Sequence, residues 1–410
     1  MSAPKASGFA AELPTCGYRL NVMRRWVGVV AMVILTSCST PVATGPGPDI
    51  NTIGGDWDRL PKPPLSARYG SRSVALEGRL YVLGGTDAEL CPPNADCKTP
   101  TDPFFTDGAV YDPSSGAWDE IADTPIPIGH GSSSVVDGKL YLLVNAYGSA
   151  HPSTRAGFLS YSPGTDRWEE LSLPPNHEER VLTSRGPRVV AFQASQENGV
   201  KEDLVFDPDS DSWSELSPDP LRASFDRWMV WTDGELVLTA IENVPQPGSD
   251  GPALYRAAVF ADDEWKAFGE SQIFGYNPEW SWTAGMVLNP SNERADGGET
   301  NNWGKTYNAG GTFDPSTGEW GLLPNPPHGR GEFEGFSAAG DRYAIAYSGW
   351  VYDALDERWT ELTRPGGAPD ADLSAVWVGN ELYLFGGVRW DGSDAVILDD
   401  AWMWGPGGPD

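Results

Sequence analysis

Basic side chains are scarce in this sequence. Its 410 residues include 28 lysines and arginines against 58 aspartates and glutamates, which gives a net charge of −30. A nucleic-acid-binding protein needs a basic surface to neutralise phosphates. The charge therefore argues against nucleic acid as a partner. An acidic coat of this size is typical of a surface that keeps a protein soluble.

Motifs that carry catalysis are also missing. The chain has no Gly-x-Ser-x-Gly motif, no complete Gly-x-x-x-x-Gly-Lys loop and no His-Glu-x-x-His motif. Its four histidines are not paired at the spacing that would bring two of them together on a helix or a hairpin. We therefore expect each to be an ordinary surface or turn residue: His130, His151, His177 and His328. We predict no catalytic residue, no metal ligand and no cofactor, and we lean against an enzyme.

Long apolar runs are absent as well. The run Trp26 to Leu35 is about ten residues long, which is too short to span a bilayer but suits a signal peptide. Arg24 and Arg25 precede it and directly follow Met23, which we expect to be the true start of translation. Residues 1–37 are therefore predicted to be a leader that directs secretion.

The leader ends in Leu35-Thr36-Ser37-Cys38, which resembles a bacterial lipobox. The resemblance implies cleavage before Cys38 and lipidation of that cysteine. A buried apolar segment with an incidental cysteine is the alternative. Residues 38–54 are rich in Pro, Gly and Thr, as a flexible tether should be. We expect a monomer held by its lipid at the extracytoplasmic face of the cell membrane.

Residues 55–406 contain a unit that recurs with drift. In its clearest copy, Gly311 to Leu323, an aromatic strand end is followed by an Asp-Pro turn and a second strand that opens with Trp. The repeated tryptophans stand roughly 40 to 60 residues apart, a period expected of a propeller array. They are Trp57, Trp118, Trp168, Trp213, Trp265, Trp320 and Trp359.

A polar corner between apolar runs precedes most of these turns. Glu77-Gly78, Asp137-Gly138 and Gly379-Asn380 are its clearest copies. Such corners are strong hairpin signals, because their residues enter positive φ at low cost. Each unit is therefore predicted to be a small antiparallel sheet.

The combination of a strand ending in Gly-Gly, a Tyr-Asp-Pro turn and a following Trp resembles the Kelch repeat. Gly84-Gly85, Tyr111-Asp112-Pro113 and Trp118 carry it most clearly. The resemblance covers about residues 55–406 and implies an all-β, seven-bladed Kelch-type β-propeller, with residues 407–410 as a tail. The third and fifth units have lost the Asp-Gly corner, so we expect their blades to be the least regular.

The two ends of the repeat region complement each other. Trp57 to Leu60 carries only the second half of the unit, whereas Asp400 to Pro406 stops after the first half, with Trp404 in place of the turn aromatic. We predict that the N-terminal strand completes the last blade. Such closure would remove the exposed sheet edges that invite aggregation.

Several insertions interrupt the repeat. Thr86 to Asp107 contains Cys91 and Cys97, which we expect to form a disulfide outside the cytoplasm. Glu242 to Pro252 and Asn289 to Lys305 are long polar loops. Propeller insertions lie at the faces, where binding is often built, but the sequence does not say which face. Four tryptophans are candidates for exposed loop tips or for packing between blades: Trp280, Trp282, Trp303 and Trp390.

Charged residues recur where the innermost strands should begin. They are Arg68, His130, Glu179 or Arg180, Asp226 or Arg227, Glu332 or Glu334, and Asp372. Together they would form a polar pocket at one channel mouth for a sugar or a small acid. Ion pairs that fill a solvated channel are the alternative. A carboxylate pair such as Glu332 and Asp372 would suit hydrolysis or epimerisation.

The Kelch resemblance also suggests galactose oxidase, whose copper site uses two tyrosines, two histidines and a cysteine bonded to a tyrosine. That chemistry needs a free cysteine near the axis. Here Cys16 falls in the leader, Cys38 matches the lipidation site, and Cys91 and Cys97 are expected to pair. We therefore expect no copper.

Three classes of function remain, because propellers serve all of them. The favoured one is a binding module for an envelope protein or an envelope glycan. A carbohydrate-active enzyme of the epimerase, lyase or oxidase type is the second. A structural component of the envelope is the third.

Overall fold

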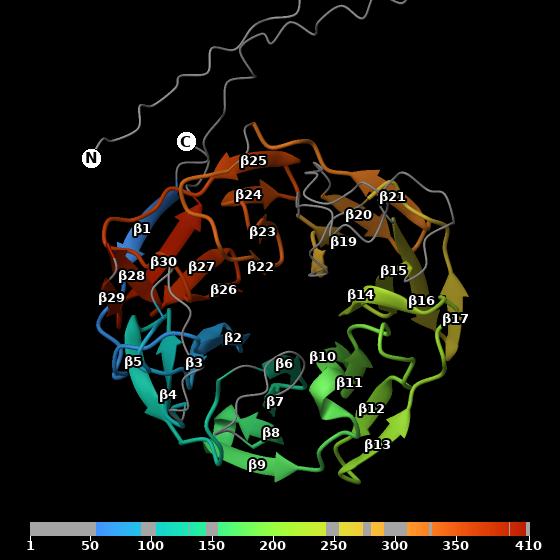
Figure 1. The fold of residues 1–410 in the computed structure, drawn as a ribbon, viewed down its shortest axis with the longest axis horizontal. Helices are drawn as coiled ribbons and strands as arrows, with labels where there is room; N and C mark the ends of the chain where they lie inside the picture. Colours follow the sequence, from blue (N-terminus) through green and yellow to red (C-terminus); the bar gives the residue numbers. More distant parts are fainter. Residues whose placement is uncertain are drawn as a thin grey trace, which may run out of the picture. The chain divides into compact units, whose positions relative to one another are not determined.

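Seven four-stranded antiparallel sheets make up most of the computed structural model, which describes residues 55–91, 104–129, 131–144, 155–242, 254–273, 280–290, 310–327, 330–392 and 394–406. Figure 1 shows the sheets as blades around a central axis. They belong to one compact unit, Pro48–Asp410. This arrangement confirms the predicted all-β, seven-bladed propeller. The predicted leader, Cys38, the tether, Cys97, His130 and the tail lie outside the described residues.

Each of the first six blades is built from four consecutive strands, numbered from the channel outward. Blade 1 contains β2 (Arg72–Leu76), β3 (Arg79–Leu83), β4 (Gly108–Asp112) and β5 (Ala117–Ile121). Blade 2 contains β6 (Gly131–Val136), β7 (Lys139–Val144), β8 (Gly157–Ser162) and β9 (Arg167–Leu171). Blade 3 contains β10 (Arg180–Arg185), β11 (Arg188–Gln193), β12 (Leu204–Asp207) and β13 (Ser212–Glu215).

The second half of the ring follows the same plan. Blade 4 contains β14 (Ser224–Trp231), β15 (Leu236–Glu242), β16 (Tyr255–Ala261) and β17 (Glu264–Ala267). Blade 5 contains β18 (Ser281–Thr283), β19 (Met286–Asn289), β20 (Gly311–Asp314) and β21 (Glu319–Leu322). Blade 6 contains β22 (Ala338–Ala339), β23 (Tyr343–Ile345), β24 (Trp350–Asp353) and β25 (Arg358–Glu361). Two short 3-10 turns, η1 (Pro163–Thr165) and η2 (His177–Glu179), lie in the linking segments.

Blade 7 is built from strands of both ends of the repeat region. It contains β26 (Ser374–Val378), β27 (Glu381–Phe385), β30 (Ala401–Pro406) and the N-terminal strand β1 (Gly55–Arg59), which pairs antiparallel with β30. Trp57 stands opposite Trp404 in this pairing. The predicted closure is therefore confirmed. An additional hairpin of β28 (Val388–Asp391) and β29 (Asp394–Ile397) leaves this blade between β27 and β30.

The seven repeated tryptophans join neighbouring blades. Each indole N–H donates to a backbone carbonyl just after the outer strand of the preceding blade. The acceptors are Thr363 for Trp57, Pro61 for Trp118, Ala122 for Trp168, Ser172 for Trp213, Ser217 for Trp265, Gly269 for Trp320 and Pro324 for Trp359, at 2.5–3.1 Å. Tryptophan suits this place because it combines a large apolar surface with one polar N–H.

The Gly-Gly doublet also marks a contact between blades. Gly85 N–H donates to Ile128 O at 2.8 Å, and a Cβ on Gly84 would lie 2.0 Å from the same oxygen. Gly387 N–H makes the matching bond to Arg68 O at 2.9 Å. Only glycine fits where the second strand of one blade ends this close to the segment that enters the next blade.

The sequence predicted that blades 3 and 5 would be the least regular, and the structure agrees for blade 5 only. The fifth blade is irregular, since β18 has only three residues. The third blade is regular, with inner strands of six residues, so that prediction was wrong. Gly186 adopts a φ of +55° there and replaces the Asp-Gly corner. The shortest inner strand among the described residues is β22 of blade 6, with two residues. The described residues contain no helix whose length and apolar character would let it cross a bilayer.

Candidate functional site

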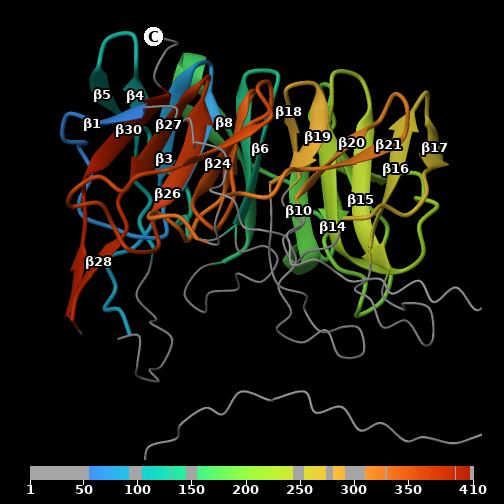
Figure 2. The ribbon, with the colours of Figure 1, turned by 90° about the horizontal axis from the view of Figure 1, so that it is seen from above.

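The blade topology places the strand ends that flank the insertions on one face. Strands alternate in direction, so the end of each second strand and the start of each third strand lie on the same side as the segment that enters the next blade. The insertions within residues 84–107, 243–254 and 290–310 each start at the end of a second strand. The β28–β29 hairpin also joins a second strand to a third, and Figure 2 shows it projecting beyond the ring. We call this side the insertion face.

The β28–β29 hairpin carries one of the four tryptophans considered as tips. Trp390 is half-buried on β28, and its N–H group on the backbone donates to Asp370 at 2.6 Å. Neighbouring Arg389 and Val396 are exposed. Trp280, by contrast, is only 3% exposed, Trp282 is half-buried on β18, and Trp303 lies outside the described residues.

Arg68 lies in the segment that enters blade 1, and its guanidinium is fully buried. It donates to both carboxylate oxygens of Asp107, at 2.5 and 2.9 Å, and to the carbonyl of Gly84 at 3.0 Å. It also stacks over the ring of Phe105, with 4.3 Å from its Cζ to the ring centroid. These contacts tie the segment entering blade 1 to the connection between β3 and β4.

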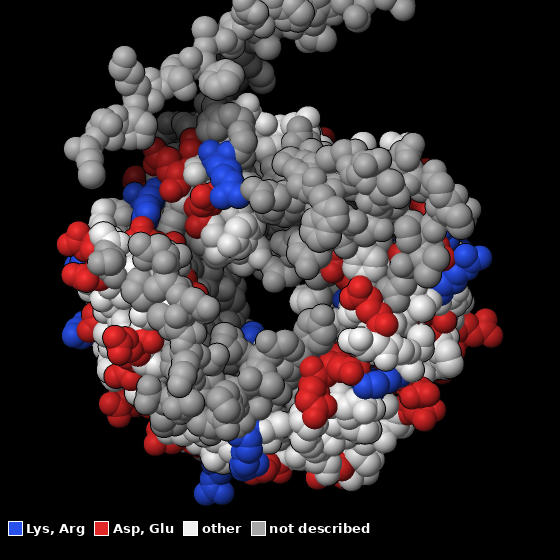
Figure 3. Space-filling model, viewed as in Figure 1, with Lys and Arg blue, Asp and Glu red and all other residues white. Residues whose placement is uncertain are grey.

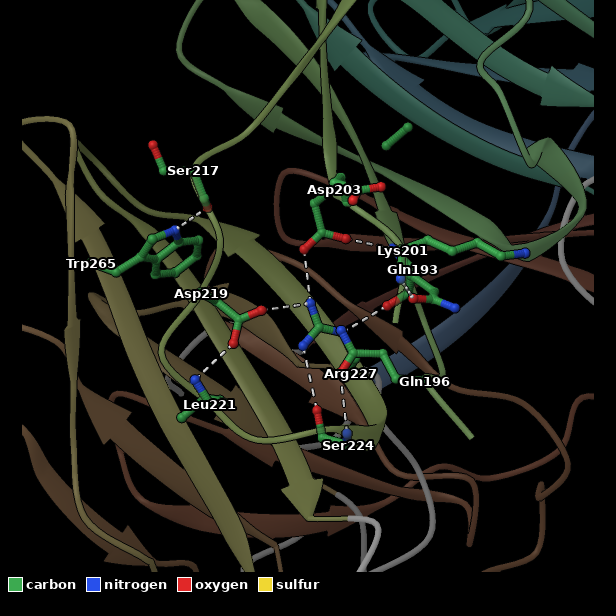
Figure 4. Close-up of polar contacts among 12 residues, drawn as sticks. Gln193, Gln196, Lys201, Asp203, Ser217, Asp219, Leu221, Ser224, Arg227 and Trp265 are labelled. Carbon is green, nitrogen blue, oxygen red and sulfur yellow. Dashed lines mark hydrogen bonds and ion pairs between the residues drawn. The ribbon is translucent and has the colours of Figure 1, made fainter. Parts of the chain in front are cut away.

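Arg227 has a similar environment between blades 3 and 4, shown in Figure 4. Its buried guanidinium pairs with Asp203 at 2.8 Å and Asp219 at 3.2 Å, and its Nε donates to the carbonyl of Gln193 at 2.9 Å. Burial raises the pKa of Asp203, while the charge of Arg227 opposes that rise. The network therefore links the two blades through charges removed from solvent.

Arg180 completes a set of three buried arginines at blade entrances. Its guanidinium donates to three backbone carbonyls, those of Pro175, Ala191 and Glu202, at 2.8–3.1 Å. Burial lowers its pKa. The bonds of these arginines hold linkers and strand ends in place. A binding role for them stays a prediction.

The acidic candidates lie in more open positions. Glu332 and Asp372 are exposed, in the segments that lead to β22 and β26. Glu334 pairs with Arg330 at 2.8 Å, and Glu179 pairs with Lys201 at 2.7 Å. The three arginines are thus buried within the blades, whereas these carboxylates remain nearer solvent.

Asp226 occupies an irregular point of the inner strand β14. The strand has a β-bulge between Phe225 and Trp228, and Asp226 adopts a positive φ of 45°. Bulges and left-handed non-glycine residues often mark sites where a side chain is re-aimed. Burial, and then the charge of Asp226, raise the pKa of Tyr255 well above its ordinary value. Asp226 therefore lies close to Tyr255.

A cavity of about 210 Å³ lies in the channel wall where blades 4, 5 and 6 meet. We call it the channel-wall cavity. Its lining residues are Trp228, Trp280, Ser281, Pro290, Ser337, Ala338, Ala339 and Ile345. Figure 3 shows the ring hollowed at its centre, with acidic side chains spread over the visible surface. Sequence reasoning missed this cavity. The run Ser337-Ala338-Ala339, small residues where an inner strand was expected, was its only local signal.

A second cavity of about 150 Å³ lies at the insertion-face end of blade 4. Its charged lining residues pair mainly with nearby side chains: Glu242 contacts Arg222 at 2.9 Å and Arg256 at 3.3 Å. Across the residues that the structure describes, no group of three or more His, Cys, Asp or Glu side chains is arranged to hold a metal ion.

No model of a protein family matches the chain. Kelch-like protein terF of Aspergillus terreus is 25% identical over 262 residues, which cover 61% of this chain and 51% of that protein. Kelch repeat and BTB domain-containing protein 13 of Homo sapiens is 25% identical over 205 residues, 49% of this chain and 37% of that protein. N-acetylneuraminate epimerase of Brucella melitensis is 24% identical over 207 residues, 50% of this chain and 48% of that protein.

The chain spans about half the length of these relatives, or less. The structure shows the features that the sequence shares with the Kelch repeat. They are the seven four-stranded sheets, the Gly-Gly doublets and the tryptophans that join neighbouring blades. This chain is a Kelch-repeat β-propeller.

Proposed function

We propose that this propeller is a binding module that holds a protein partner on its insertion face. Kelch propellers generally mediate contacts between proteins. The observation that carries the proposal here is the β28–β29 hairpin, which projects from the insertion face and serves no role in the blade pairing. A projecting hairpin with an aromatic and a basic side chain is suited to bind another protein.

The composition of the hairpin supports a protein partner. Trp390 and Arg389 are residue types that dominate the binding energy of protein interfaces. Val396, 39% exposed, stands opposite Arg389 and adds apolar surface. The Asp370 carboxylate, held by Arg364, anchors the backbone of Trp390 and so fixes the base of the hairpin. A pre-ordered hairpin loses less entropy on binding than a flexible loop.

The net charge indicates the electrostatic character of the partner. With −30 on the chain, a partner with a basic face would be drawn in faster than an acidic one. Association should therefore slow as salt concentration rises.

Substitutions in the hairpin test the binding role. Crosslinking in intact cells would identify a partner, and biolayer interferometry with that purified partner would give affinities. Trp390→Ala combined with Arg389→Ala should weaken binding by at least about tenfold. Leu355→Ala is the matched control, because Leu355 is 62% exposed in the turn between β24 and β25, on the opposite face. Equal affinity of the hairpin variant and the parent would contradict the proposal.

The lipid anchor is the second part of the proposal. The lipobox-like Leu35-Thr36-Ser37-Cys38, the preceding apolar run and the Pro-rich segment behind it support it. Cys38→Ala should move the protein from the membrane fraction to the soluble fraction. Ser37→Ala, a small change that keeps the cysteine, is the control. Unchanged membrane retention of the Cys38 variant would overturn the anchor.

Export would also place Cys91 and Cys97 in an oxidising compartment, where we propose that they form a disulfide. Peptide mapping under non-reducing conditions should recover the two cysteines in one linked peptide. Free thiols at both positions in protein purified without reductant would overturn this pairing.

An enzyme of carbohydrate metabolism is a second candidate, supported by the similarity to the Brucella epimerase. Nuclear magnetic resonance of N-acetylneuraminate would decide the point. A binding module leaves the rate at which its epimers interconvert unchanged, whereas an epimerase accelerates it.

A further inference from the structure

We propose that the channel-wall cavity is a binding subsite for a single neutral sugar ring. This site is separate from the β28–β29 hairpin, so the inference goes beyond the protein partner proposed above. The inference depends on three observations: the cavity that two short inner strands leave, the chemistry of its lining residues, and the charges near the cavity.

The cavity arises from the inner strands of blades 5 and 6. β18 has three residues and β22 two, whereas β14 has eight. The side chains at this point are also small, being Ser281, Ala338 and Ala339. The wall is therefore hollowed where longer strands and larger side chains would fill it. At about 210 Å³ the cavity is smaller than the roughly 300–1,000 Å³ of sites for drug-sized ligands, so it suits one ring.

Two tryptophans give the cavity rigid apolar sides. Trp280 packs edge-on against Tyr255, with ring centroids 5.1 Å apart, and against Trp320 at 6.0 Å. Trp228 packs against Phe192 at 5.9 Å. Because these neighbours hold both indoles, their surfaces are in place before any ligand arrives. Pre-organised aromatic surface lowers the entropic cost of binding.

Hydroxyl groups provide the polar part of the lining. Ser281 and Ser337 reach the cavity, and a hydroxyl both donates and accepts hydrogen bonds. The Ser281 hydroxyl is oriented by contacts with Thr283 at 3.0 Å and with the carbonyl of Leu288 at 3.3 Å. A pyranose has apolar C–H faces and a rim of hydroxyls. It therefore matches aromatic sides combined with serine hydroxyls better than a purely apolar group does.

The charges around the cavity favour a neutral ligand over an acid. None of the lining residues is Lys or Arg. Asp226 lies on the same strand as Trp228 and acts on Tyr255, which packs against Trp280. The negative charge of Asp226, in a chain of net charge −30, disfavours an anionic sugar and leaves a neutral one unaffected. A peptide is disfavoured because a stable protein interface needs about 1,000 Å² of contact, far more than this recess offers.

Ligand-observed saturation-transfer nuclear magnetic resonance on the full chain tests the subsite. The probes are glucose, galactose, mannose and N-acetylglucosamine, with N-acetylneuraminate as the acidic comparison. We expect at least one neutral sugar to bind. Trp228→Ala should weaken that binding at least about tenfold. The control is Trp231→Ala, on the same strand but outside the cavity lining.

A second variant guards against misfolding. Ala339 is exposed and lines the cavity, so Ala339→Phe fills the space without removing a packed side chain. It should abolish sugar binding while the melting temperature stays that of the parent. The hairpin variant Trp390→Ala with Arg389→Ala should keep full sugar binding, which separates this site from the protein-binding face.

Four outcomes would overturn the proposal: no binding of any neutral sugar by the parent, preference for N-acetylneuraminate, unchanged binding in a folded Ala339→Phe variant, or equal losses in the Trp228 and Trp231 variants.

Discussion

The indole N–H of Trp57 donates to the carbonyl oxygen of Thr363 at 2.7 Å, across 306 residues of chain. Trp57 lies on β1, and Thr363 follows β25, the outer strand of blade 6. The same bond recurs at every other blade junction. The blade built from both ends of the chain therefore contacts its neighbour as the other six do.

Replacing Trp57 by Phe should weaken this junction modestly. The variant keeps an aromatic ring and loses the hydrogen bond to Thr363, a loss of about 1 kcal/mol in the free energy of unfolding. Urea denaturation followed by far-ultraviolet circular dichroism would measure it. Trp390→Phe, outside the ring of junctions, should leave the unfolding free energy unchanged. A Trp57 variant as stable as the parent would mean that the bond contributes nothing.

Deleting Asp56 to Leu60 should destabilise the protein far more than this substitution. Without β1, the strand β30 becomes an exposed sheet edge, and blade 7 loses the bond from Trp57 to Thr363 of the neighbouring blade 6. We expect the melting temperature to fall by on the order of 10 °C or more, since each kcal/mol shifts a chain of this size by a few degrees. Differential scanning calorimetry would measure it, with a deletion of residues 407–410 as the control. A parent-like melt would contradict the closure.

Arg227→Ala should be strongly destabilising. It leaves the carboxylates of Asp203 and Asp219 buried without their cation, and breaking a buried ion pair in this way costs about 3–5 kcal/mol. Urea denaturation would measure the loss. Arg222→Ala is the control, because Arg222 is 76% exposed and its pair with Glu242 should contribute under about 1 kcal/mol. Adding Asp203→Asn to Arg227→Ala should recover part of the loss. Equal effects of the two arginine variants would refute the network's role.

Asp314 should contribute to the pH dependence of stability. The hydroxyl and N–H of Ser316 donate to its carboxylate at 2.7 and 2.9 Å, and this hydrogen bonding lowers the pKa of Asp314 below 3.8. A carboxylate with a lowered pKa in the folded state stabilises the fold above pH 3.8. That stability is lost as the pH falls through the lowered pKa.

The variant Asp314→Asn should therefore be less stable than the parent at pH 6, with the difference shrinking below pH 3.8. Melting temperatures measured from pH 2.5 to pH 6 would show it. Asp391→Asn, at an exposed hairpin position, should follow the parent curve. A constant difference between the Asp314 variant and the parent across this range would contradict the assignment.

Most of the fold could be predicted from local sequence patterns. The turn before each Trp, the polar corners and their spacing specify a hairpin wherever they occur, because backbone conformation at these residues depends on near neighbours. The half units at Trp57 and Trp404 likewise indicated that the two ends complete one blade. Blade 3 was misjudged because Gly186 supplies the required positive φ in a different sequence context.

The sequence by itself determined the number of blades and the closure. Only the tertiary structure decided what Arg68, Arg180 and Arg227 contact, from which face the insertions start and where the wall is hollow. The reason is physical: hydrogen bonds along a hairpin join residues close in sequence, whereas the channel-wall cavity requires Trp228, Ser281 and Ala339 from three blades to meet. Such a meeting is set by packing around the whole ring.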